Sequence, residues 1–237
     1  MGYLVLEGGA EFGGAMQRPD RHALGLAGGT SCRVRIVPAA AAPDRNHVRA
    51  GNNGVAWFRS LGVRDVRSVP LIDPDSAADP DLARTLSEGA LIYLLGGFPG
   101  YLAGVLDRSL AWKAMMAVEA RGGVLAGSSA GAMVLCEHFY DPAQKRVRNG
   151  LGLVPGACIV PHHDTFGHQW VPVLKKLLPA ATLIGIDEQT GLIGSMESDR
   201  WVVRGKGGVT LYRNAGRCDY AEWDEVRLAG GRDPMSS

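Results

Sequence analysis

The chain has 237 residues, of which 46% are hydrophobic and 21% charged, and a formal net charge of +1. This balance is typical of a globular protein, and the scattered Lys and Arg residues exclude the basic surface that nucleic acid or an anionic membrane would require. The first residues lack the basic start of a signal peptide, and no run reaches the roughly 20 apolar residues of a membrane span. We therefore expect a cytoplasmic location, with neither nucleic acid nor membrane as a partner.

The cysteines show neither CxxC nor Cys/His metal-ligand spacing. There are four, all far apart: Cys32, Cys136, Cys158 and Cys218. Such spacing favours free thiols in a reducing compartment over a disulfide framework. No metal or other cofactor is expected.

Short apolar runs alternate with helix-like segments along the chain. The expected strands are, in chain order, Tyr3–Leu6, Arg33–Val37, Val66–Ile72, Ala90–Leu95, Gly123–Ala126, Cys158–Val160 and Leu183–Ile186. The expected helices are Gly51–Leu61, Asp81–Glu88, Tyr101 to about Ala120, Ala130–His138 and Trp170–Leu178. Short alternating segments follow at Gly191–Ile193, Trp201–Val203 and Val209–Tyr212.

This alternation predicts an α/β fold with a mostly parallel sheet and helices on both of its faces. The short segments near the C-terminus predict β-hairpins. No repeat or low-complexity linker divides the chain, so residues 1–237 are expected to form a single domain. The last residues, Gly230–Ser237, are expected to be frayed.

The segment Ala126–Ala132 has the pattern of a nucleophile turn. Its residues Gly127, Ser129 and Gly131 satisfy Gly-x-Ser-x-Gly, between an expected strand and an apolar helix. Small neighbours are needed because the backbone of such a turn is strained and crowded. We therefore predict Ser129 as the nucleophile, with the backbone N–H of Ala130 directed at the developing oxyanion. The alternatives are a serine that merely caps the helix, and Ser128 as the nucleophile.

A second glycine turn, Leu95–Gly100, follows the preceding strand. In a parallel sheet this loop would lie beside the nucleophile, where its backbone N–H groups could complete an oxyanion hole. The alternative is an ordinary turn between a strand and a helix.

The base and the orienting acid are sought at the carboxyl ends of strands, where parallel sheets place catalytic groups. His162 and His163 both follow the strand that ends at Val160, and the residues alone do not choose between them. His22, His47 and His138 are expected in polar loops or at a helix end. Among the candidate acids, Asp141, Asp164, Asp187 and Glu188, we favour Glu188 because it ends the strand Leu183–Ile186.

Several blocks in this order resemble the cyanophycinase and dipeptidase E family of serine peptidases. They are Gly8-Gly9, Leu95-Gly96-Gly97, Ala126–Ala132, Gly150–Leu153 leading to Pro161-His162, and Ile184–Glu188. The resemblance implies a flavodoxin-like fold of the class I glutamine amidotransferase type, and hydrolysis through an acyl-enzyme at aspartyl or β-aspartyl bonds. It also implies that His162 is the base, and that N–H groups near Gly97 and of Ala130 form the oxyanion hole.

The chain departs from the family pattern where substrate is read. Phe98-Pro99 stands where cyanophycinases carry Gln or Asn, and the stretch Asp164–Trp170 after the histidine pair has no Arg where they are Arg-rich. We therefore expect a serine hydrolase acting on a small peptide or amide, with a specificity different from cyanophycin. The alternatives are an amidase of other specificity and a catalytically silent binding module. A glutaminase is disfavoured because class I amidotransferases use Cys where this chain has Ser129. A homodimer is left open.

Overall fold

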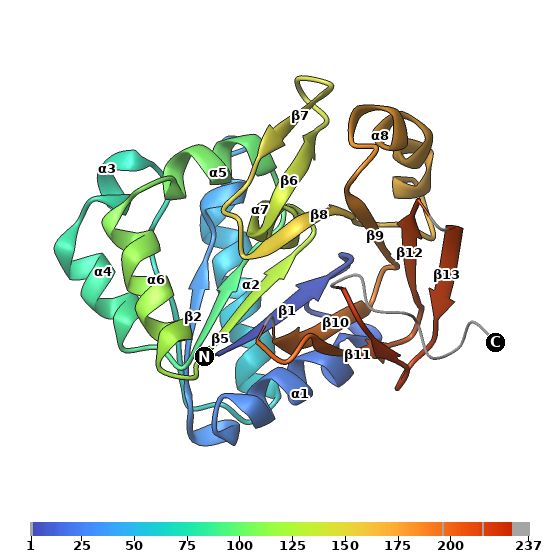
Figure 1. Ribbon diagram of the computed structural model, residues 1–237. Helices are drawn as coiled ribbons and strands as arrows, with labels where there is room; N and C mark the ends of the chain where they lie inside the picture. Colours follow the sequence, from blue (N-terminus) through green and yellow to red (C-terminus); the bar gives the residue numbers. More distant parts are fainter. Residues whose placement is uncertain (1, 196, 215, 229–237) are drawn as a thin grey trace.

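The computed structural model describes residues 2–195, 197–214 and 216–228. Within these ranges the strands form two sheets (Figure 1). The first has eight strands in the spatial order β14 (Glu225–Val226), β11 (Arg200–Gly205), β10 (Thr190–Ser195), β1 (Tyr3–Glu7), β5 (Val124–Ser128), β4 (Leu91–Leu94), β2 (Arg33–Val37) and β3 (Asp65–Ser68). The second has six, in the order β13 (Gly216–Tyr220), β12 (Val209–Arg213), β9 (Thr182–Ile186), β8 (Val154–Val160), β6 (Cys136–Asp141) and β7 (Arg146–Asn149).

The first sheet is parallel from β1 through β5, β4 and β2 to β3, and antiparallel beyond β1. The order β3-β2-β4-β5 is that of a flavodoxin-like sheet, with β1 in the place of its fifth strand. After β2 the next strand is added on one side of it, whereas after β4 the next strand is added on the opposite side. The loops that follow β2 and β4 therefore diverge, which makes this position a topological switch point. The predicted flavodoxin-like α/β fold is confirmed.

Helices cover both faces of this parallel region (Figure 1). They are α1 (Gln17–Leu26), α2 (His47–Ser60), α3 (Pro74–Ala77), α4 (Pro80–Ser87), α5 (Pro99–Leu106), α6 (Leu110–Ala120) and α7 (Ala130–Leu135), whereas α8 (Val171–Leu177) packs against the second sheet. Successive side chains of a strand point to opposite faces. In β4, Ile92 and Leu94 pack in the core with α4, α5 and α6, whereas Leu91 and Tyr93 pack in the core with α1 and α2.

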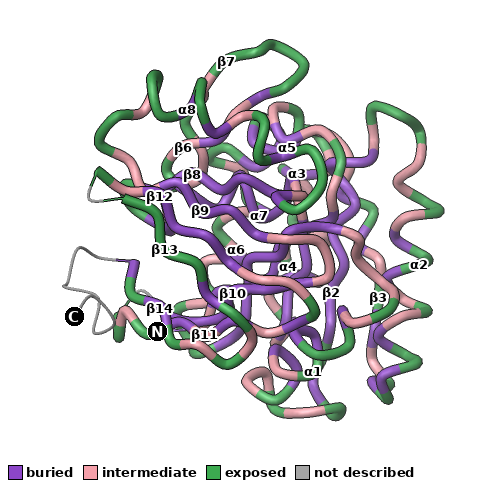
Figure 2. Tube along the Cα trace, turned by 90° about the vertical axis from the view of Figure 1, so that its right-hand side faces the viewer, coloured by how far each residue is buried: buried purple, intermediate pink, exposed green. Residues whose placement is uncertain are grey.

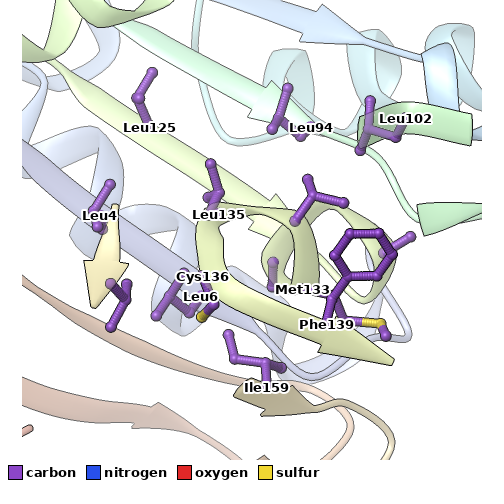
Figure 3. Close-up of a cluster of buried hydrophobic side chains, with 14 of the residues drawn as sticks. Leu4, Leu6, Leu94, Leu102, Leu125, Met133, Leu135, Cys136, Phe139 and Ile159 are labelled. Atoms are coloured by element: carbon purple, nitrogen blue, oxygen red, sulfur yellow. The ribbon is translucent and has the colours of Figure 1, made fainter. Parts of the chain in front are cut away.

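Helix α7 and the start of β6 join the two sheets (Figure 3). Met133 and Leu135 of α7 and Phe139 of β6 share one buried cluster with Leu6 of the first sheet and Ile159 of the second. All of these side chains are at most 2% exposed, so one continuous core holds the sheets together. Figure 2 shows this buried interior along the central strands, and the exposed residues that gather on β7.

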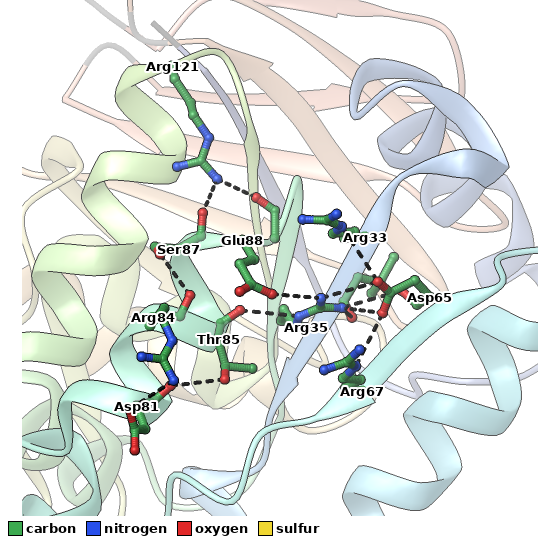
Figure 4. A network of polar contacts seen from close by, with 12 residues as sticks. Arg33, Arg35, Asp65, Arg67, Asp81, Arg84, Thr85, Ser87, Glu88 and Arg121 are labelled. Atoms are coloured by element: carbon green, nitrogen blue, oxygen red, sulfur yellow. Dashed lines mark hydrogen bonds and ion pairs between the residues drawn. The ribbon is translucent and has the colours of Figure 1, made fainter.

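A buried arginine ties β2 to β3 (Figure 4). The guanidinium of Arg35 is 0% exposed and lies 2.8 Å from the Asp65 carboxylate, and the Thr85 carbonyl accepts a further hydrogen bond from it. The hydrogen bond that Arg35 donates to Asp65 is the largest of the effects that lower the pKa of Asp65. A buried cation requires such pairing, so the network fixes the edge of the parallel sheet.

Two expected helices differ from those observed. The segment from Tyr101 to Ala120 forms two helices, because Arg108 adopts φ +54° and Ser109 begins α6 by accepting a hydrogen bond from the Trp112 N–H. The helix after Ser129 ends at Leu135 instead of continuing to His138. Its last carbonyls accept hydrogen bonds from the returning chain, including the Leu153 N–H, and residues 136–141 become strand β6.

The remaining differences are local. His22 lies in α1 and His47 begins α2, so neither is in a loop, and His138 lies in strand β6. The strand expected to reach Ile72 ends at Ser68, and Asp73 caps the short helix α3 that follows. The predicted C-terminal hairpins are confirmed, but the sheet formed by β6 to β9 with β12 and β13 was not foreseen. The segment Gly230–Ser237 lies outside the described residues.

Candidate active site

Ser129 occupies a strained turn between β5 and α7. Its backbone adopts φ +49° and ψ −110°, a conformation that L side chains rarely take and that marks a strained turn. The turn requires small neighbours: a Cβ on Gly127 would lie 2.4 Å from the backbone of Gly131, and one on Gly131 would lie 2.2 Å from the Leu94 carbonyl. The Ser129 N–H donates to the Glu7 carbonyl (3.0 Å), which holds the turn against β1.

His162 lies directly after β8 and faces Ser129. Its Nε2 is 3.1 Å from Ser129 Oγ. The backbone N–H of His162 donates to the Gly8 carbonyl (2.7 Å). The imidazole ring stacks on Phe166, with the ring centroids 4.8 Å apart. A Cβ on Gly9 would lie 2.2 Å from the ring, so glycine is required where β1 leads past the histidine.

Glu188 completes a hydrogen-bonded row with these two side chains. Its Oε1 lies 2.8 Å from His162 Nδ1, and a carboxylate can only accept there, so Nε2 is left to accept the Ser129 hydroxyl proton. The other candidate acids have different partners. Asp164 accepts the Glu188 N–H (2.8 Å), and Asp141 forms an ion pair with Arg148 (3.2 Å).

The residues next in sequence to His162 and Glu188 form a second row, which does not include Ser129. His163 Nδ1 lies 3.2 Å from Asp187 Oδ1, and His163 Nε2 lies 2.9 Å from the Tyr212 hydroxyl. Burial alone would raise the pKa of Asp187, but hydrogen bonds from His163 and from the Gly208 N–H outweigh it, and the pKa is lowered. The two neighbouring histidines thus have different partners, Ser129 and Glu188 for His162, and Asp187 and Tyr212 for His163.

The predicted oxyanion donors belong to the turn after β4 and to the start of α7. Ala130 begins α7, where the first N–H groups of a helix have no partner inside it. Gly97 is exposed and adopts φ +139°, and a Cβ there would lie 2.2 Å from the Ala40 carbonyl. A Cβ on the adjacent Gly96 would lie 3.4 Å from Ser129 Cβ, so this glycine turn does lie beside the serine.

Glu11 is a site residue that the sequence analysis missed. Its carboxylate accepts the Gly96 N–H (3.3 Å) and the hydroxyl of Ser128 (2.9 Å), and so links the two turns. Ser128 is 0% exposed, which leaves Ser129 as the accessible hydroxyl.

A buried acidic pair lies behind the nucleophile turn. Glu7 and Asp20 are both 0% exposed. Tyr93 donates its hydroxyl to Glu7, and Trp57 donates its indole N–H to Asp20 (2.7 Å). Burial raises the pKa of Glu7 well above its usual range and that of Asp20 to about 7, so the pair retains protons that exposed carboxyls would lose.

Neither a cluster of metal ligands nor a membrane-spanning helix is found among the described residues. No group of three or more His, Cys, Asp or Glu side chains among them could hold a metal ion. None of the helices in this part of the chain is both long and apolar enough to cross a membrane.

Comparison with known proteins identifies the family of the chain. The model of peptidase family S51 matches residues 4–198. A cyanophycinase from Geminocystis herdmanii (strain PCC 6308) is 29% identical over 78% of this chain and 71% of its own length. A cyanophycinase from Synechococcus elongatus is 28% identical over 84% of this chain and 64% of its own length.

Solved structures show the same fold. A peptidase from an acI-B1 Actinobacterium superimposes with a TM-score of 0.84 at 26% identity, over 96% of this chain and 97% of that one. A peptidase E protein from Listeria monocytogenes EGD-e gives a TM-score of 0.61 at 19% identity, over 90% and 98% of the two chains. The chain therefore belongs to peptidase family S51 and is a serine-type peptidase.

Proposed function

We propose that this peptidase cleaves a small peptide or amide through an acyl-enzyme on Ser129, with His162 as general base and Glu188 as the acid that orients it. One observation carries the proposal: the row in which Ser129 Oγ lies 3.1 Å from His162 Nε2 and His162 Nδ1 lies 2.8 Å from Glu188. A nucleophile, a base and an orienting carboxylate within hydrogen-bond reach are the requirements of this mechanism.

Each group has one task in the reaction. Ser129 Oγ attacks the substrate carbonyl while His162 Nε2 takes its proton, and Glu188 stabilises the imidazolium that results. The N–H groups of Gly97 and Ala130 stabilise the charge that develops on the carbonyl oxygen. The imidazolium then protonates the leaving amine, and water attacks the acyl-enzyme by the same route to release the acid and restore the serine.

The resemblance implied an aspartyl or β-aspartyl bond, and this finer expectation needs a cation to hold the substrate carboxylate. The guanidinium that lines a cavity beside Gly97 is that of Arg148, and it is ion-paired with Asp141. Aspartyl and β-aspartyl dipeptides therefore belong in the first substrate panel, together with peptides that carry uncharged side chains.

A fluorophosphonate probe tests the proposal without knowledge of the substrate. We expect the wild-type protein to gain one covalent adduct, and Ser129→Ala to gain none. Ser128→Ala is the matched control, because it removes the adjacent hydroxyl, and it should still be labelled. A folded wild-type protein that is not labelled would instead support the catalytically silent binding module.

A further inference from the structure

We infer that a cavity between the start of α5 and the β6–β7 hairpin receives the substrate side chain on the acyl side of the cleaved bond, and that it selects an uncharged, largely apolar side chain. We call this cavity the acyl pocket. Its volume is about 600 Å³, enough for a large side chain. The inference rests on the proposed function and adds the substrate class to it.

The position of the acyl pocket connects it to the nucleophile. Gly97 lines it, and the neighbouring Gly96 is close enough to Ser129 that a Cβ there would lie 3.4 Å from the serine Cβ. Pro43 lines it from the loop after β2, and Gly97 from the loop after β4. The topological switch point of the sheet lies between these two strands. Open α/β sheets bind ligands in the crevice at such a point.

The direction of the reaction assigns the acyl side of the substrate to this pocket. The carbonyl carbon attacked by Ser129 carries an oxygen, a leaving nitrogen and the acyl residue. The nitrogen must face His162, which donates its proton, and the oxygen must face the N–H groups of Gly97 and Ala130. The acyl residue is left to extend toward the glycine turn, whose Gly97 lines the pocket, whereas His162 is not among the lining residues.

The charge in the acyl pocket is already neutralised. Arg148 donates to Asp141 Oδ2 (3.2 Å) and to the Gly100 carbonyl (3.2 Å). Asp141 is 3% exposed, and its other oxygen accepts the Ala143 N–H (3.1 Å). A substrate carboxylate could recruit Arg148 only by leaving this buried carboxylate without its cation, which is strongly unfavourable.

The remaining wall of the pocket is mostly apolar. It includes the side chains of Phe98, Pro99, Tyr101, Pro142 and Ala143. An apolar wall favours a substrate side chain that leaves no polar group unpaired.

The test uses aminoacyl phosphonate diphenyl esters, which carry one amino-acid side chain and form a covalent bond with a reactive serine. Labelling rates of the Gly, Leu, Phe, Asp and Lys analogues are measured by intact mass, beside a fluorophosphonate without a side chain. We expect the Leu and Phe analogues to react at least about tenfold faster than the Asp and Lys analogues. An Asp analogue that reacts fastest, or rates that do not exceed that of Gly, would overturn the inference while leaving the proposed function intact. If the plain fluorophosphonate fails to label the folded protein, the proposed function fails as well.

Two variants test the wall and the charge separately. Phe98→Ala should slow the Phe analogue by about tenfold, whereas Val173→Ala, which trims a 41% exposed side chain on α8, should change nothing. Asp141→Asn keeps an oxygen for the Ala143 N–H but frees the charge of Arg148, so it should speed the Asp analogue specifically. A folded Asp141→Asn protein with an unchanged Asp-to-Leu ratio would refute the charge argument.

Discussion

The buried carboxyl of Asp20 should make the protein less stable as the pH rises, and Asp20→Asn should remove this effect. Asp20 is 0% exposed in the core beneath β1, and it accepts the Trp57 indole N–H at 2.7 Å. Burial raises its pKa to about 7, although hydrogen bonds from Trp57 and Glu7 offset part of this rise. Asparagine has nearly the shape of the protonated acid and can still accept the indole N–H, but it carries no titrating proton.

The sign and size follow from the two pKa values. In the unfolded chain Asp20 should lose its proton near pH 3.9, whereas in the native protein it retains it up to about pH 7. Between these values each pH unit lowers the free energy of unfolding by about 1.4 kcal/mol. The difference of about three units corresponds to at most about 4 kcal/mol above pH 7. Asp20→Asn should therefore be more stable than the wild type at pH 8, by up to this amount, and nearly equal to it at pH 4.

Urea unfolding at pH 4, 6 and 8 measures this directly. The exposed Asp44→Asn is the matched control and should track the wild type at each pH. An Asp20→Asn protein that is less stable than the wild type at pH 8, or a difference that does not grow with pH, would show that the buried pair is not protonated as argued.

Three further predictions concern the fold and the site. Asp65→Ala should lower the free energy of unfolding by about 3 kcal/mol, because it leaves the buried Arg35 guanidinium without its main partner. The pKa of Asp65 is lowered in the folded protein, so the wild type itself loses this stabilisation as the pH falls below about 4, and the difference between the two proteins should shrink there. Equal urea midpoints for Asp65→Ala and the wild type at pH 7 would refute this prediction. Glu188→Gln should reduce kcat on an activated ester by about 10³–10⁴-fold, because the amide no longer holds the required His162 tautomer, and a change under tenfold would count against its role. Phe166→Ala should lower kcat about tenfold without shifting Tm, because the His162 ring loses the face on which it stacks; an unchanged kcat would contradict this.

Local signals explain what could be predicted of the fold. Short apolar runs were enough to predict the parallel strands. The strained turn around Ser129 could be predicted because it requires a pattern of small residues of its own. The break between α5 and α6 also has a local signal, since Ser109 is a favoured N-cap. The end of α7 has none of comparable strength. The end of α7 depends on Leu151 and Leu153, whose backbone N–H groups donate hydrogen bonds to the carbonyls of Val134 and Leu135. These donors lie well beyond α7 in the chain, so the sequence around α7 does not show them.

The same distinction applies to the site. Glu188 could be chosen because the ends of parallel strands converge, whichever residues lie between them. Glu11 could not, because its partners Gly96 and Ser128 lie 85 and 117 residues away, and a lone glutamate after a glycine pair carries no signal of its own. The position after a strand left His162 and His163 open, and the family resemblance alone implied His162; in the structure it is His162, with φ +50°, that lies within reach of Ser129.

The packing between the two sheets has a consequence for the row of Ser129, His162 and Glu188. Ser129 follows β5 of the first sheet, whereas His162 and Glu188 follow β8 and β9 of the second. The distances within the row therefore depend on how the two sheets are packed against each other. A substitution in the core between the sheets is expected to disturb the row even where the turn around Ser129 is itself intact.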